Sequence, residues 1–134
     1  MANRRSKARE YALLSLFPQF LEGSNASDSL EYLFDERKPG EAVREFAREL
    51  LEGVLEHQVS LDERIASSLD TWPFERLGNI EKTILRIAVY ELMHCPATPP
   101  SAILNEAVSL SEEYATPDST RFVNGVLANI ARKE

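Results

Sequence analysis

Apolar residues recur at intervals of three and four along almost the whole chain, and strict alternation of apolar and polar residues is nearly absent. This spacing places apolar side chains on one face of an α-helix, whereas alternation is typical of a half-buried strand. The clearest stripe is Val43, Phe46, Ala47, Leu50, Leu51, Val54 and Leu55. The pattern predicts an all-α fold of about seven helices.

The first helix is expected from about Ser6 to Leu21, and Pro18 should kink or shorten it because proline lacks a backbone donor. Further along the chain, Ser60 followed by Glu63 has the form of a capping box, which predicts that a helix begins there. Two further boundaries are expected, with Trp72 and Pro73 ending that helix and Ser101 capping a later one.

The segment from Ile80 to Met93 carries apolar residues on several sides, which is typical of a helix surrounded by neighbours. We expect one domain, 1–134, built from two packed helical bundles. The N-terminal lobe would span 1–59 and the C-terminal lobe 60–134, because a lobe of about 60 residues buries too little surface alone.

Basic residues gather at the start of the chain. Residues 1–9 contain Arg4, Arg5, Lys7 and Arg9 and no acid, so the net charge of −7 divides into +4 here and −11 elsewhere. Such a segment is either a solvated, frayed terminus or an arm that neutralises nucleic-acid phosphates. The composition leaves both interpretations open.

Residues that could carry chemistry are few. His57 and His94 lack a partner at a metal-ligand spacing, and no glycine-rich phosphate loop is present. Cys95 follows His94 directly, but adjacent residues rarely face each other, which favours an ordinary thiol. We therefore expect no enzyme, metal or cofactor. A single cysteine and no long apolar run favour a cytoplasmic protein without a membrane span.

Three sequence blocks resemble the NusB transcription antitermination factors. They are Trp72 with Arg76-Leu77, Glu81-Lys82 and 84–92; Asn105-Glu106-Ala107-Val108 with Leu110; and Arg121-Phe122-Val123-Asn124-Gly125-Val126-Leu127. The start of the chain, Arg4-Arg5 and then 7–10, is similar to the arginine-rich start of that family. The likeness covers nearly the whole chain and is weakest from 23 to 40.

The resemblance implies a non-catalytic, all-helical factor that binds boxA RNA of ribosomal RNA leaders together with NusE, a small-subunit ribosomal protein. The complex would then join the RNA polymerase antitermination complex. An acidic body suits a basic partner of this kind. An apolar patch left free without NusE could close a homodimer of the unbound protein.

The resemblance also implies roles for individual residues. Those expected at the RNA are Arg4, Arg5, Lys7, Arg9, Asp118, Arg121 and Phe122, and those expected at the protein partner are Phe17 and Glu81. The spacing of Phe122 and Phe17 fits core packing equally well. Glu81 could instead be a charge in the first turn of a helix.

Several distinctive residues are expected to be structural, namely Glu91, Asn105, Glu106, Asn124 and Gly125, with the glycine allowing two helices to approach closely. Two other functions remain open at this point. One is a helical scaffold or dimerisation module with an incidental basic arm. The other is an RNA-binding lobe like that of certain ribosomal RNA methyltransferases, which would need a catalytic extension.

Overall fold

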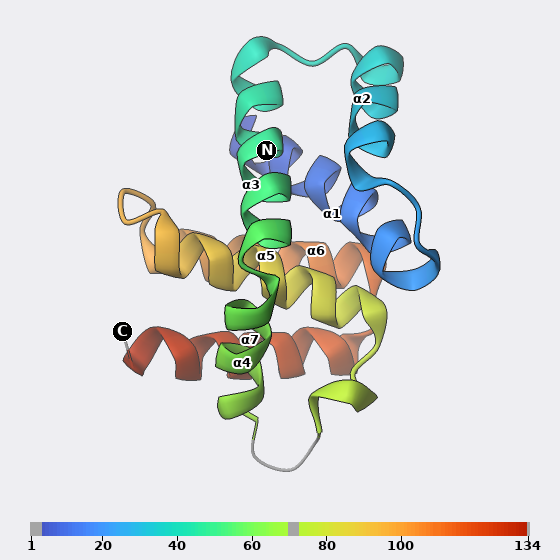
Figure 1. Ribbon diagram of the computed structural model, residues 1–134. Coiled ribbons are helices and arrows are strands. Elements are labelled where there is room, and N and C mark those ends of the chain that lie inside the picture. The colour runs from blue at the N-terminus through green and yellow to red at the C-terminus, as the bar shows by residue number, and fades with distance from the viewer. Residues whose placement is uncertain (1–3, 70–72, 134) are drawn as a thin grey trace.

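The computed structural model describes residues 4–69 and 73–133, and these residues form helices and no strand. The helices are α1 (Arg4–Glu22), α2 (Ala26–Arg37), α3 (Glu41–Glu56), α4 (Gln58–Ser67), α5 (Asn79–His94), α6 (Pro100–Tyr114) and α7 (Pro117–Lys133), with a short 3-10 turn, η1 (Phe74–Arg76). The predicted all-α fold is confirmed (Figure 1).

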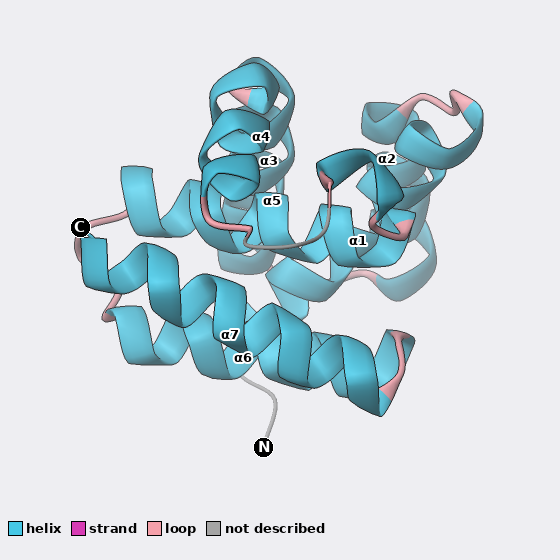
Figure 2. Ribbon diagram, turned by 90° about the horizontal axis from the view of Figure 1, so that it is seen from below, coloured by secondary structure: helices cyan, strands magenta, loops and turns pink. Residues whose placement is uncertain are grey.

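Helix α5 lies at the centre of the molecule. It contacts α1, α3, α4, α6 and α7, and all nine residues from Thr83 to Glu91 are buried. The apolar residues on several sides of this segment pack against these neighbouring helices, as the sequence predicts. Helices α6 and α7 pack side by side against one side of α5 (Figure 2).

The first three helices form a group of their own around α1. Helix α1 packs against both α2 and α3, and Leu16, Phe34 and Leu50 from these helices are fully buried. Helix α1 also contacts α5, which joins this group to the rest of the protein. The residue pair at which the lobes are expected to divide, 59 and 60, lies within the first turn of α4.

The predicted shortening of the first helix is wrong. Helix α1 continues through Pro18 to Glu22, so the missing proline donor falls within its last turns. Gly23 ends the helix with a positive φ of 82°, and its N–H donates to the carbonyl of Gln19 over 2.9 Å. Glycine favours this left-handed ending because it has no Cβ.

Two predicted helix starts are also wrong. Ser60 lies inside α4, and its hydroxyl donates to the carbonyl of His57 over 3.0 Å instead of capping a helix. Helix α6 begins at Pro100, because a proline suits a first position that needs no backbone donor. Ser101 is therefore not the cap. Trp72, the expected end of α4, lies outside the described residues, and α4 ends at Ser67.

No helix in the described part of the chain has both the length and the apolar character needed to cross a membrane.

Candidate nucleic-acid interface

Exposed cations occupy the first turn of α1. Arg4, Arg5 and Lys7 are exposed, and this turn contains no acidic residue. The guanidinium of Arg5 lies 4.3 Å from the centre of the Phe46 ring on α3. A cavity of about 480 Å³, lined by Arg4, Arg5, Ala42 and Phe46, opens here. The arrangement presents two guanidinium groups beside an aromatic ring.

Arg9 does not belong to this exposed group. It is 3% exposed, and it donates to both carboxylate oxygens of Glu91 on α5, over 2.7 and 2.8 Å. A second carboxylate, on Glu106 of α6, lies 3.9 Å from its Nη1. Arg9 therefore faces the interior between α1 and α5, apart from the three exposed cations.

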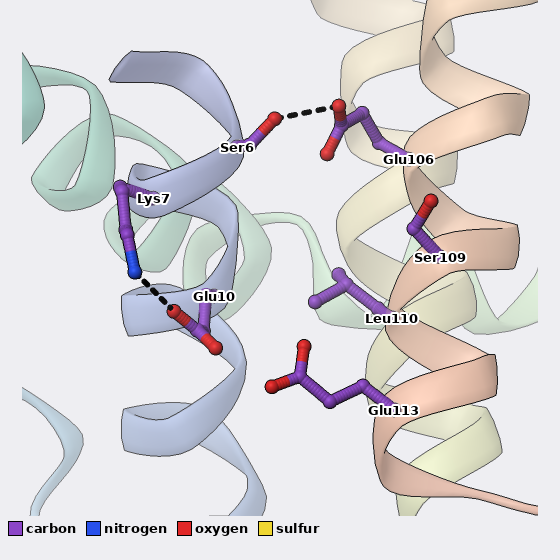
Figure 3. Close-up of a pocket in the computed structure, with 7 residues that line it drawn as sticks. All are labelled: Ser6, Lys7, Glu10, Glu106, Ser109, Leu110 and Glu113. Carbon is purple, nitrogen blue, oxygen red and sulfur yellow. Dashed lines mark hydrogen bonds and ion pairs between the residues drawn. The ribbon is translucent and has the colours of Figure 1, made fainter. Parts of the chain in front are cut away.

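Acidic residues occupy the side of α1 that faces α6. A cavity of about 480 Å³ lies there, and Glu10, Glu106 and Glu113 are among its lining residues (Figure 3). Lys7 Nζ is 3.5 Å from Glu10, and Ser6 donates to Glu106 over 2.6 Å. Carboxylates on this side repel a polyanion. A nucleic acid would therefore approach the start of α1 from the side of Arg4 and Arg5.

The same acidic side holds a tyrosine. Tyr114 donates its hydroxyl to Glu10 over 2.7 Å. Partial burial, and then this hydrogen bond to a carboxylate, raise the pKa of Tyr114 above its usual value. The phenol therefore stays protonated at physiological pH and links α6 to α1.

A second group of expected site residues meets at the start of α7. Glu81, Asp118 and Phe122 line one cavity of about 270 Å³, although they are far apart in the sequence. Ser119 donates a hydrogen bond to Glu81, which joins the first turns of α7 and α5. Arg121 is exposed and pairs with Asp118 one turn earlier. The structure thus brings a ring, a cation and two carboxylates to one place.

The exposure of Phe122 and Phe17, which were each expected either at a surface site or in the core, is intermediate. Phe122 and Phe17 are each half-buried and pack against the core, so neither is a fully exposed ring nor a fully buried one. Phe122 lines the cavity at the start of α7. Phe17 lies on α1 and is not among the residues that line this cavity.

The sequence-based site omitted Arg76 and Leu77, which line the same cavity as Phe122. Both residues stand in the first block of the family resemblance, so the signal was available. Arg76 is exposed and adds a cation to this cavity, whose residue Asp118 pairs with Arg121. The contacts of η1 with α4, and of its Phe74 ring with Lys82 on α5, hold this segment in place.

The residues expected to be structural divide into two groups. Glu91 and Glu106 interact with Arg9, as a structural role requires. Asn105, Asn124 and Gly125 are exposed, and a Cβ built on Gly125 meets nothing within 4 Å. The prediction that Gly125 allows two helices to approach closely is therefore wrong.

The two histidines lie together despite their separation in sequence. The rings of His57 and His94 stack with centroids 4.4 Å apart, and Tyr90 stacks on His94 at 5.0 Å. Burial and the nearby carboxylate of Glu49 raise the pKa of Cys95 to about 12. The thiol is therefore protonated at neutral pH, and a protonated thiol is a poor nucleophile. Among residues 4–69 and 73–133, no three potential metal ligands cluster.

Comparison with known proteins identifies the class of protein that this fold and surface define. The model of the NusB family matches residues 6–132. A transcription antitermination protein NusB of Bacillus velezensis is 39% identical over 127 residues, which cover 95% of each chain. The chain belongs to the NusB family.

Solved structures agree with this assignment. NusB of T. maritima superposes with a TM-score of 0.90 and 30% identity, covering 100% of this chain and 94% of that one. A structure of antitermination factors NusB and NusE in complex with double-stranded RNA has a TM-score of 0.89 and 29% identity, with complete coverage of both chains. Membership in a family of antitermination factors confirms the prediction of a non-enzymatic protein.

Proposed function

We propose that this protein binds boxA-type RNA of ribosomal RNA leaders together with NusE and joins the RNA polymerase antitermination complex in the cytoplasm. The observation that carries the RNA part is the exposed group of Arg4, Arg5 and Lys7 at the start of α1. A similar chain has been solved with NusE and double-stranded RNA, which supports the same pairing here.

The start of α1 and the start of α7 would contact different parts of the RNA. The arm, Arg4, Arg5 and Lys7, would neutralise phosphates, which gives affinity without sequence preference. At the start of α7, the half-buried ring of Phe122 would stack on an unpaired base while Arg121 holds the backbone. Arg9 has its charge satisfied by Glu91, so we assign it to positioning the arm.

The partner surface is proposed on Phe17 and Glu81, and the net negative charge of the remaining chain would attract a basic protein. Glu81 shares a cavity with Asp118 and Phe122. The protein partner and the RNA would therefore meet at the start of α7. A homodimer of the unbound protein would use the same partner surface, and it would dissociate when NusE binds.

The arm is tested through the salt dependence of RNA binding. Each phosphate contact on a single strand contributes about −0.7 to the slope of log K against log salt, so replacing Arg4, Arg5 and Lys7 with Ala should flatten the slope by roughly 2. Fluorescence anisotropy of labelled boxA RNA with NusE present measures the slope. A matched control replaces Lys38, Arg132 and Lys133, which are also exposed cations.

Equal slopes for the arm variant and the control variant would show that the arm is not the phosphate-binding surface. Absence of RNA binding at low salt with NusE present would contradict the proposed function itself, and would favour a helical scaffold.

The ring at the start of α7 is tested with Phe122→Ala. Stacking on one base contributes about 1–3 kcal/mol, so RNA affinity should fall roughly tenfold. Because the ring is half-buried, the free energy of unfolding should fall by less than the ~3–5 kcal/mol typical of a fully buried aromatic residue. Anisotropy and urea denaturation measure the two effects. Unchanged affinity would exclude the ring from the RNA surface.

A further inference from the structure

A second cavity adjoins the arm and shares Arg5 with the cavity beside Phe46. It has a volume of about 370 Å³ and lies between α1, the connector that precedes α6, and α6 itself. Arg5, Arg9, Thr98, Pro99 and Asn105 are among the residues that line it. None of the roles proposed above uses this cavity. Its volume lies at the small end of the range found for ligand pockets.

The lining combines apolar and polar residues. Ala97, Pro99 and Ala102 form the apolar part, and Asn105 and Thr98 supply neutral donors and acceptors. Asn105 is exposed, and its side chain makes no hydrogen bond with the described residues. A carboxamide presents a donor next to an acceptor, which matches the edge of a nucleobase in two parallel hydrogen bonds.

Two arginine side chains line the cavity. Arg9 is fixed by its two hydrogen bonds to Glu91, and it is almost fully buried. Arg5 lies at the boundary between this cavity and the one beside Phe46, and its guanidinium contacts that ring. A strand whose phosphates contact Arg5 would therefore lie at the edge of this cavity.

The charges of the lining are nearly balanced. The carboxylate of Glu106 lines the same cavity as the guanidinium of Arg5, and Arg9 is already paired with Glu91. The lining therefore favours a neutral, hydrogen-bonding group over an anion or a cation. An unpaired base fits this description, and RNA-binding proteins commonly recognise bases that are unstacked from single strands.

We propose that this cavity holds one unpaired nucleobase of the RNA strand bound by the arm, with Asn105 hydrogen-bonding the edge of that base. The proposal rests on the proposed function, because the arm must first hold the strand. It makes Asn105 a residue that reads RNA sequence, whereas Arg4, Arg5 and Lys7 bind any strand.

The test is a scan of boxA RNAs in which one nucleotide at a time lacks its base. With the unaltered chain and NusE, one abasic position should lower affinity about tenfold by anisotropy. With Asn105→Leu, the same abasic position should change affinity less than twofold, because the contact is already lost. Asn124→Leu is the matched control, since Asn124 is also an exposed helical asparagine and does not line this cavity.

The outcomes separate the two proposals. If the unaltered chain binds RNA but the abasic profile of Asn105→Leu equals that of Asn124→Leu, the base site is wrong and the proposed function stands. If the unaltered chain binds no RNA, both are wrong. Thr98→Val gives an independent variant of the same cavity, and it should weaken the same abasic effect.

A free nucleotide is the other source of a base. In the NMR spectrum, the side-chain amide of Asn105 should shift on addition of boxA RNA. Millimolar nucleoside 5′-monophosphates alone should shift it far less, because they lack the neighbouring phosphates that the arm binds. A shift with free nucleotide and none with RNA would overturn the proposal.

Discussion

The interface of α1, α3 and α5 and the outer face of α7 contain the same residue types in opposite surroundings. In the interface, Arg9 is buried against Glu91 and Gly53 is buried beside the ring of Tyr90. On α7, Arg121 is exposed beside Asp118, and Gly125 faces open space. The surroundings of an arginine or a glycine in the packed structure therefore determine its role, and the number of charges in the sequence does not.

The largest effect should come from breaking the buried pair. Glu91 is 1% exposed in the unaltered chain, and in Arg9→Ala its carboxylate would lose the donor of both hydrogen bonds. Removing one partner of a buried ion pair typically costs about 3–5 kcal/mol. Urea denaturation followed by circular dichroism should show this loss in the free energy of unfolding.

Two further variants sharpen the result. Arg121→Ala removes an exposed pair and should change stability by less than about 0.5 kcal/mol. The double variant Arg9→Met with Glu91→Leu should recover most of the loss, because apolar residues of similar volume often replace a buried pair at no cost. A similar small effect for Arg9→Ala and Arg121→Ala would contradict the burial of Arg9.

The second prediction concerns the glycine of the interface. A Cβ added at Gly53 would overlap the ring of Tyr90, which is itself buried. Overpacking of this kind costs about 1–3 kcal/mol, so Gly53→Ala should unfold at lower urea concentration. Combining it with Tyr90→Leu, which removes the ring, should cost less than the sum of the two single changes. Additive losses would show that the ring and the glycine are not in contact.

The helices and the central position of α5 were predictable from periodicity alone. The stripes predicted the helices, and the continuous apolar segment predicted the central position of α5. Arg9 lies four residues before Leu13 and seven before Leu16, both fully buried. Because residues at this spacing share one face of a helix, the spacing predicts that Arg9 faces the interior. Its partner was not predictable, because Glu91 lies 82 residues away.

The site was predictable only as separate pieces. The family resemblance indicated Glu81, Asp118 and Phe122, but their common cavity depends on how α5 packs against α7. Helix boundaries failed where a local signal competed with packing. Ser60 has the form of a cap, yet α4 already begins at Gln58, with only His57 separating it from α3.

Apart from the Arg121→Ala control, the smallest effect should come from the glycine of α7, and its sign should be opposite to that of Gly53. Gly125 lies inside a helix, where alanine is favoured because glycine loses more backbone entropy on folding. The added methyl group at this position meets no atom within 4 Å. Gly125→Ala should therefore raise the free energy of unfolding by about 0.4–1 kcal/mol, measured by urea denaturation beside Gly53→Ala. A loss of stability would mean that α7 packs against a neighbour at this position, and the contrast between the two glycines would then disappear.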